Sequence, residues 1–395
     1  MSGCIRNGSL FILAFILILV IFGNAFADST GINADTIVIG QSCALEGPNK
    51  ALGIGMRNGA DAYFAYINAN GGIKNKKIKL ITYDDGYEPV ACKKNTETLI
   101  DMDKVFLLFG YVGTPTSKVA APLAVAKKVP FFAPFTGAEF LRTPVKKEIF
   151  NIRASYYQET EMMVERLTQD LGISKISVFY QNDSYGEAGL EGVRRALQKR
   201  DLTILSKGHY ERNTAEVNDA VTIFNKTTPD AILMIGAYKA CAELVREMRG
   251  YKSKAVFMNV SFVGGDALGR DLSNTGIGVL VTQVTPFPRY KKIPVVAEYL
   301  KLNKEHNNGV KPTYVGMEGF IAAKALCEIL KKCPGKITRS KFIATAEEQN
   351  SLELGGFEIS FSRKDHQGSD MVRLTQICPG GYLERLDNLW QIREY

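Results

Sequence analysis

Short apolar runs alternate with amphipathic stretches along the first part of the chain. The run 105–109 (VFLLF) is apolar at every position, which is typical of a strand buried on both faces of a parallel sheet. The stretch 52–68 places Ala60, Tyr63 and Ile67 at helical spacing. The predicted strands are 36–40, 78–83, 105–109 and a short one around 131, and the predicted helices are 52–68, 95–102 and 115–127. This alternation indicates a doubly wound α/β layer.

The same rhythm restarts after Arg153. The predicted helices are 159–170, 186–198, 215–224 and 240–248, and the predicted strands are 176–180, 203–206, 231–235 and 256–258. A strand at 278–284 leads into a mainly helical region that ends near residue 349, and strands at 357–360, 371–376 and 382–385 close the chain. We therefore predict a second α/β layer of the same kind.

The length of the chain favours two lobes, because single hydrophobic cores stop growing at about 250 to 300 residues. We expect the chain to cross between the lobes three times, near 152–154, 282–285 and 355–361. The predicted domains are a signal peptide over 1–27, a first lobe over 28–153 plus 284–355, and a second lobe over 154–283 plus 356–395.

The first 27 residues have the pattern of a cleaved export signal. Arg6 precedes an unbroken apolar run at 10–22, and Ala25 and Ala27 supply the small residues before a cut. A retained membrane anchor is the alternative, but the run is shorter than the roughly 20 residues that span a bilayer. Cys4 lies before the run, so a lipid-anchored start has no thiol in the right place. We predict an exported, periplasmic protein.

The formal charge of +8 is spread along the chain without a basic block, so we expect no nucleic-acid partner. Six cysteines follow the signal segment, in spacings that do not resemble a metal site. An oxidising compartment allows disulfides. Two pairings are candidates, Cys43 with Cys92 and Cys327 with Cys333, and the sequence leaves Cys241, Cys378 and both pairings undecided.

Two loops that follow neighbouring predicted strands are rich in hydroxyl groups and small residues. They are 111–117 (YVGTPTS) and 134–138 (PFTGA). Helix capping alone explains either loop, whereas two such loops at adjacent strand ends favour a shared anion site. Aromatic residues gather at the corresponding positions of the second half, where core packing is less expected. They are Tyr156, Tyr157, Tyr185, Tyr238 and Phe262.

Catalytic motifs are missing. The chain has no GxSxG elbow, no phosphate-binding loop of the GxxxxGK type and no HExxH, and its three histidines stand in unrelated contexts. Asp84 and Asp85 are adjacent in a predicted strand end, so their side chains point to opposite faces and make a poor acid–base pair. We predict a protein that is not an enzyme and needs no cofactor.

Several segments together resemble the leucine/isoleucine/valine-binding periplasmic proteins. They are TIVIGQSCALEGP at the start, NANGG at 68–72, Tyr83 with the two aspartates after it, the two hydroxyl-rich loops, and Tyr185-Gly186-Glu187. The resemblance runs from about residue 35 to 385. It implies a type I two-lobed clamp that captures a small molecule and delivers it to an inner-membrane ABC permease. A monomer is expected, and a periplasmic component of a signalling receptor is the alternative.

The resemblance also implies roles for individual residues. The ligand carboxylate is expected at Thr114, Thr136 and Gly137, and Tyr185 and Tyr238 are expected to cover the ligand, with Tyr156 placed near the first crossing. Members that bind amino acids carry an acidic side chain where this chain has Ser261. A buried ammonium group without a partner is costly. We therefore expect a carboxylate-bearing ligand, either an organic acid that lacks the amino group or, if Glu318, Asp183 or Glu159 reaches the site, a branched-chain amino acid.

Overall fold

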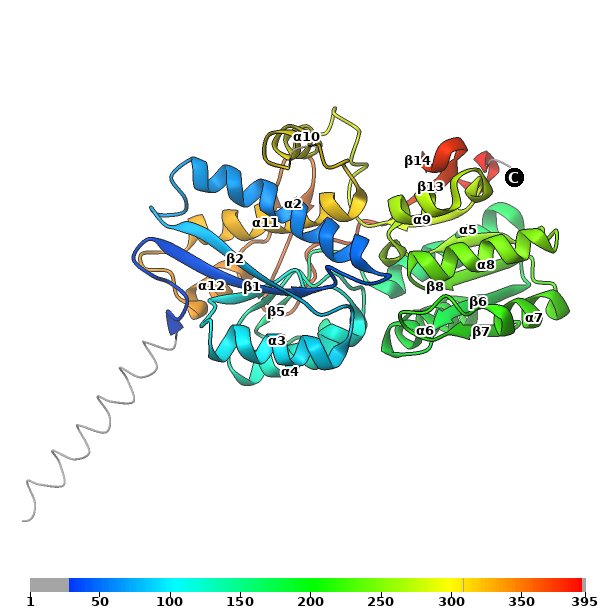
Figure 1. Ribbon diagram of the computed structural model, residues 1–395, viewed down its shortest axis with the longest axis horizontal. Helices are drawn as coiled ribbons and strands as arrows, with labels where there is room; N and C mark the ends of the chain where they lie inside the picture. The colour runs from blue at the N-terminus through cyan, green and yellow to red at the C-terminus, as the bar shows by residue number, and fades with distance from the viewer. Residues whose placement is uncertain (1–27, 308, 393–395) are drawn as a thin grey trace, which may run out of the picture.

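The computed structural model describes residues 28–307 and 309–392, which form two α/β bodies side by side (Figure 1). The predicted signal segment lies outside the described residues. The first sheet has the strand order β2-β1-β3-β4-β5, and every pair in it is parallel. Its strands are β1 (Thr36–Cys43), β2 (Lys77–Asp84), β3 (Leu107–Phe109), β4 (Phe131–Phe132) and β5 (Ile149–Phe150).

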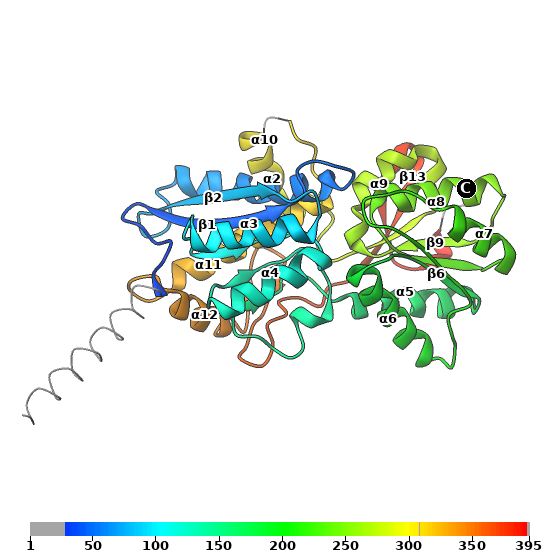
Figure 2. The same cartoon turned by 60° about the horizontal axis from the view of Figure 1, so that its bottom comes forward.

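Helices cover both faces of this sheet (Figure 2). On one face lie α3 (Pro89–Asp101) and α4 (Thr114–Ala126), and on the other α2 (Lys50–Ala69) packs against α11 (Tyr314–Lys332). Glycines bring these last two backbones together: a Cβ at Gly59 would lie 1.9 Å from the carbonyl oxygen of Gly316. The helices α10 (Pro294–His306) and α12 (Arg339–Glu347) complete this body.

The second sheet has the order β14-β13-β10-β9-β8-β6-β7. Strands β6 to β10 run parallel to one another, whereas β13 and β14 are antiparallel to their neighbours. The strands are β6 (Ile176–Gln181), β7 (Lys207–Tyr210), β8 (Ala231–Ile235), β9 (Val256–Asn259), β10 (Leu280–Gln283), β13 (Arg373–Cys378) and β14 (Tyr382–Leu386). Its helices are α5 (Tyr156–Leu171), α6 (Ser184–Gln198), α7 (Asn218–Thr227), α8 (Tyr238–Gly250) and α9 (Gly265–Leu272).

Three connections join the two sheets. The first runs from β5 to α5, and the second runs from β10 to α10. Before the third, β11 (Leu352–Glu353) pairs with β12 (Glu358–Ile359), and the following segment contacts the first sheet. There the rings of Phe361 and His366 lie 5.3 and 4.0 Å from that of Phe150. The chain reaches the second sheet only after this contact, at β13.

One predicted strand was misplaced, and two were missed. The expected strand at 203–206 is irregular, and the strand is β7, four residues later. Its buried positions are Gly208 and Tyr210, so only one large apolar side chain signals it. The strands β5 and β11 have two residues each, too few to show a period.

Neither candidate disulfide is formed, because Cys43, Cys92, Cys327 and Cys333 are buried free thiols. Cys92 lies inside helix α3, and its Sγ faces the carbonyl oxygen of Thr116 at 3.6 Å. The Sγ of Cys333 turns back to the carbonyl oxygen of Ile329 at 3.5 Å, while Cys327 faces the core of α11. Burial raises the pKa of the Cys327 thiol, which keeps it protonated.

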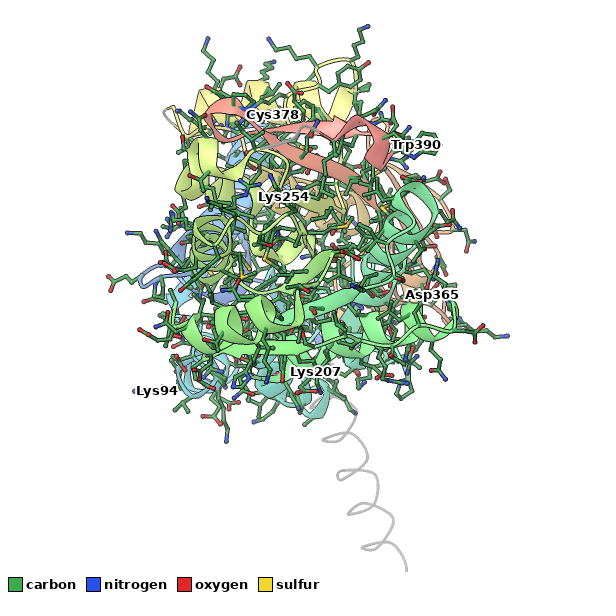
Figure 3. All side chains as sticks on the ribbon, turned by 90° about the vertical axis from the view of Figure 1, so that its right-hand side faces the viewer. Lys94, Lys207, Lys254, Asp365, Cys378 and Trp390 are labelled. Atoms are coloured by element: carbon green, nitrogen blue, oxygen red, sulfur yellow. The ribbon has the colours of Figure 1, made fainter. Side chains whose placement is uncertain are left out.

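Basic side chains are spread over the surface, with Lys94, Lys207 and Lys254 well separated (Figure 3). Across residues 28–307 and 309–392, no helix combines the length and the apolar character needed to cross a bilayer.

Candidate functional site

The two hydroxyl-rich loops meet, as their positions after neighbouring strands predict. Oγ1 of Thr114 and Oγ1 of Thr136 lie 2.7 Å apart, both fully buried, and the Oγ1 of Thr136 is 3.3 Å from the hydroxyl oxygen of Tyr156. Gly113 allows the first loop to turn at a φ of 107°, where a Cβ would lie 2.2 Å from the ring of Tyr87. The loops therefore present paired hydroxyl groups at the start of α4.

Gly137 has a packing role beside these hydroxyl groups. A Cβ there would lie 2.5 Å from Cδ1 of Tyr156, and its carbonyl oxygen accepts a hydrogen bond of 2.8 Å from the Tyr156 backbone N–H. The absent side chain therefore lets the first turn of α5 approach the loop. A buried Arg142 holds the same junction, since its guanidinium donates to the carbonyl oxygens of Ala138 and Arg153 at 2.9 Å each.

Aromatic rings from both bodies meet next to the hydroxyl pair. In this aromatic cluster the centroid of Tyr185 lies 5.5 Å from that of Tyr156 and 4.6 Å from that of Phe262. Phe262 in turn lies 6.0 Å from Tyr87 and 5.3 Å from Phe135, which both belong to the first body. The sequence pointed to Tyr156, Tyr185 and Phe262 by their positions after strands. Tyr87 and Phe135 were missed, although Phe135 lies inside the flagged 134–138 loop.

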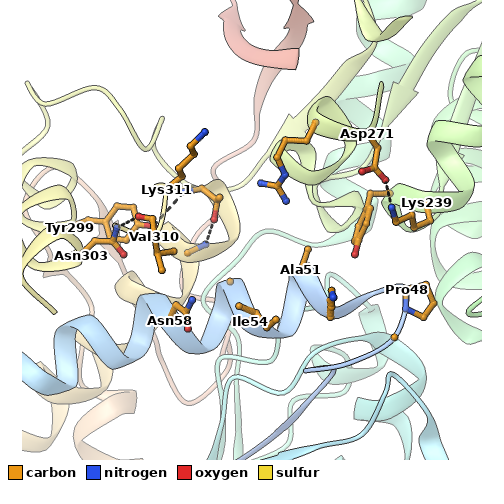
Figure 4. A pocket seen from close by; sticks show the side chains of 17 residues that line it. Pro48, Ala51, Ile54, Asn58, Lys239, Asp271, Tyr299, Asn303, Val310 and Lys311 are labelled. Atoms are coloured by element: carbon orange, nitrogen blue, oxygen red, sulfur yellow. Dashed lines mark hydrogen bonds and ion pairs between the residues drawn. The ribbon is translucent and has the colours of Figure 1, made fainter. Parts of the chain in front are cut away.

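Tyr238 lies elsewhere, in a pocket of about 490 Å³ between the two bodies. Figure 4 shows the start of α2 along one side, with Pro48 and Ala51, and the ion pair of Lys239 with Asp271 on another. Tyr238 and Leu52 both approach Gly264, two residues beyond Phe262. The structure thus places Tyr238 beside the aromatic cluster's outer edge, not among its rings.

A buried charge cluster stands at the first connection between the bodies, and the sequence analysis missed its central residue. Arg153 is 1% exposed and its guanidinium carbon lies 4.7 Å from the centroid of Phe135. Its Nη2 donates to the hydroxyl oxygen of Ser261 and lies 3.6 Å from Oε1 of Glu159. Its Nη1 lies 3.6 Å from Oε1 of Glu318 on α11. A charged residue inside a predicted crossing was the available signal.

The three acidic residues considered from sequence differ in what they already bind. Both carboxylate oxygens of Glu159 accept from Ser261, through its backbone N–H at 2.7 Å and its hydroxyl at 3.0 Å, and Thr282 also donates. Asp183 caps α6 by accepting from the Tyr185 N–H at 2.9 Å and pairs with Arg212 at 3.0 Å. Glu318 contacts Arg153, and burial raises its pKa to about 7.

A second set of polar contacts joins the bodies at the surface. We call it the rim set: Arg212 and Asn213 of the second body with Glu88, Asn49 and Gly86 of the first. Arg212 Nη2 lies 2.8 Å from a Glu88 oxygen, and the Asn213 amide bonds Glu88 at 2.6 Å and the Gly86 carbonyl at 3.0 Å. The Asn49 amide donates to Asn213 at 2.7 Å.

Within the described chain no group of histidine, cysteine or acidic side chains could hold a metal ion.

Comparisons with known proteins agree with this architecture. The periplasmic binding protein family model matches residues 36–381. A crystal structure from Rhodopirellula baltica SH 1, described as a possible leucine/isoleucine/valine-binding protein, is 35% identical, with a TM-score of 0.87 over 93% of this chain and 100% of that one. The leucine-specific-binding protein of Salmonella typhimurium is 21% identical over 76% of this chain and 81% of its own.

A fatty acid ABC transporter substrate-binding protein from Thermomonospora curvata shares the fold, with 17% identity and a TM-score of 0.82 over 90% of this chain and 92% of that one. This chain belongs to the periplasmic binding protein family. The predicted type I fold is confirmed, and so is the prediction that the protein is not an enzyme, because the family consists of substrate-binding proteins.

Proposed function

We propose that this protein is the periplasmic substrate-binding component of an ABC importer and that it captures a small carboxylate-bearing molecule between its two bodies. The observation that carries the proposal is the buried Thr114–Thr136 hydroxyl pair next to aromatic rings from both bodies. Hydroxyl groups at the start of a helix suit a carboxylate, because backbone N–H groups and the helix dipole favour negative charge there. The leucine-binding relatives support the same class of solute.

The proposed lobes follow the two sheets. We assign residues 28–153 and 284–368 to the first lobe, since the segment up to 368 contacts Phe150 and Asn151, and the remaining described residues to the second. Binding then closes the clamp: ligand docks on the hydroxyl pair, and Tyr185 and Phe262 of the second lobe cover it. The binding free energy shifts an equilibrium between open and closed forms.

We further propose that the ligand lacks an α-amino group. Ser261, which stands at the position of the family's acidic side chain, bonds Arg153 and Glu159 instead of offering a free carboxylate. A cation, Arg153, therefore stands at this position beside the carboxylate of Glu159, whose oxygens Ser261 and Thr282 already bond. An ammonium group brought next to Arg153 would be repelled in a buried setting of low effective dielectric.

Calorimetric titration with leucine and its keto analogue, 4-methyl-2-oxopentanoate, tests the proposal. We expect the keto acid to bind and leucine to bind at least tenfold more weakly, since a charged hydrogen bond is worth about 1.5 to 3 kcal/mol. A Thr136→Val variant should lose most of the keto-acid affinity, and Thr98→Val, on the exposed side of α3, is the control. Tight binding of leucine without binding of the keto acid would refute the ligand assignment.

The partner is tested separately. Pull-down from inner-membrane extracts, with and without the bound acid, should recover an ABC permease. Recovery of a receptor or sensor kinase domain in its place would favour the sensory alternative.

A further inference from the structure

The guanidinium of Arg153 is buried but incompletely bonded. Its Nε and Nη1 have no hydrogen-bond partner among the described residues, and only Nη2 donates, to Ser261. The 3.6 Å separations from Glu159 and Glu318 are charge contacts rather than hydrogen bonds. Buried polar groups are nearly always hydrogen-bonded, and an unmet buried donor is costly. The guanidinium of Arg142, the neighbouring buried arginine, donates hydrogen bonds to carbonyl oxygens instead.

Arg153 stands in the same cluster as the proposed carboxylate site. Its guanidinium lies over the ring of Phe135, the residue before Thr136, at 4.7 Å from the centroid. Tyr156, whose hydroxyl oxygen is 3.3 Å from Thr136, lies close enough to Arg153 for that charge to lower the Tyr156 pKa against the larger effect of burial. Ser261 brings the second body to the same guanidinium. A short molecule seated on the hydroxyl pair is therefore within reach of this cation.

We propose that Arg153 binds a second acidic group of the ligand, so that the captured solute is a small dicarboxylate rather than a monocarboxylate. This proposal rests on the proposed function, because it takes the first carboxylate to lie at Thr114 and Thr136. Arginine suits the second acidic group, since its N–H groups match a carboxylate and such charge-assisted bonds are the strong ones.

The charge of the surroundings agrees with an anionic ligand. Arg153 and Arg142 carry two positive charges against the one negative charge of Glu159, whose oxygens Ser261 and Thr282 already bond. Burial raises the pKa of Glu318 to about 7, so half of the molecules carry a proton there near neutral pH. The protonated carboxyl group donates its O–H to a ligand carboxylate. The pocket at the clamp's outer edge is lined by four cationic side chains and one carboxylate: Lys50, Lys239, Arg270 and Lys311 with Asp271. A pocket with this lining attracts anions to the space between the two bodies.

A matched pair of five-carbon acids tests the proposal. 2-Oxopentanedioate and 2-oxopentanoate differ only in a carboxylate or a methyl group at the far end. Calorimetry on the wild-type protein should show the diacid binding roughly ten- to a hundredfold more tightly, the range expected for a hydrogen-bonded charge. Arg153→Gln should remove this preference while leaving 2-oxopentanoate bound, and Arg153→Lys should retain part of it. Arg339→Lys is the control and should preserve the preference, because that buried guanidinium donates to the carbonyl oxygens of Val105 and Phe106, which precede β3.

Measuring the ligand affinity of the wild-type protein at several pH values needs no variant, so it tests the proposal even if Arg153→Gln misfolds. Glu318 is faced by Arg153 and Arg142 and by the carboxylate of Glu159. Proton uptake by Glu318 therefore decides whether ligand affinity rises or falls with pH. A diacid prefers the protonated form, and its affinity should rise from pH 8 to pH 6, whereas an ammonium ligand would show the opposite trend. Equal affinities for the two acids, or an unchanged preference in folded Arg153→Gln, would overturn the proposal and leave the proposed function intact. Binding of leucine alone would overturn the proposed absence of an α-amino group, and binding of none of these compounds would overturn the proposed function itself.

Discussion

Two sets of polar contacts join the same two bodies, one in the interior and one at the surface. The hinge cluster of Arg153, Glu159, Ser261 and Glu318 is almost wholly buried, whereas in the rim set the side chains of Arg212 and Glu88 are 24% and 47% exposed. Buried charges that lose a partner leave a costly unpaired group, while exposed pairs are worth at most about 1 kcal/mol. The hinge cluster should therefore govern folding and ligand charge, and the rim set the balance between open and closed forms.

The largest effect is expected at Glu159. Replacing it with alanine removes the acceptor for the Ser261 N–H, the Ser261 and Thr282 hydroxyls and the charge opposite Arg153. The free energy of unfolding should fall by about 3 to 5 kcal/mol, measured by urea denaturation. Glu161→Ala, on the same helix but paired at the surface with Lys199, is the control and should cost less than about 1 kcal/mol. Equal costs would break the contrast between hinge and surface.

A pH effect of intermediate size is expected from Glu318. Burial raises its pKa in the folded state to about 7 from its ordinary value of 4.5, so the folded protein holds a proton that the unfolded chain releases. Stability from this group is present below about pH 4.5 and is lost as pH rises towards 7, by about 3 kcal/mol. Glu318→Gln should remove that slope. Asp85, with its pKa raised to about 6, adds a similar slope in both proteins. The measurement is therefore the difference between wild type and Glu318→Gln in how the free energy of unfolding changes with pH.

The smallest effect on stability is expected at the rim. Arg212→Ala removes the bonds to Glu88 and Asp183 and should change the free energy of unfolding by less than about 1 kcal/mol. It should nevertheless open the ligand-free protein, seen as a larger radius of gyration in small-angle scattering, and weaken binding of the acid. Arg194→Ala, which breaks an exposed pair within α6, should leave both unchanged. An unaltered scattering profile in Arg212→Ala would remove the rim set from the closing equilibrium.

The fold could be predicted from the sequence where elements are long and regular. The strand Ala231–Ile235 is fully apolar and was expected at these residues, and the alternation around it identified the α/β class. Short elements escaped, because β5 and β11 have two residues each and β7 offers one large buried side chain. The meeting of Thr114 with Thr136 was foreseeable, since parallel neighbours end at one edge of a sheet.

The rest depended on residues far apart in the chain. Tyr238 follows a strand just as Tyr185 follows one, yet only Tyr185 joins the aromatic cluster, whereas Tyr238 lines the pocket beside the start of α2. Arg153 is a single charged residue in a short connection, and its partners come from α5, the loop after β9 and α11.

By itself, the sequence determined the α/β class, the two layers, the family and the paired hydroxyl loops, since these rest on local periodicity and on motifs within a few residues. Only the tertiary structure decided that the four cysteines of the two candidate pairs stay unbridged, that Ser261 bonds Arg153, and that a half-bonded guanidinium lies beside the proposed carboxylate site. Local patterns report which face of an element is buried. The charge that a buried site presents is set by the side chains that distant segments bring together.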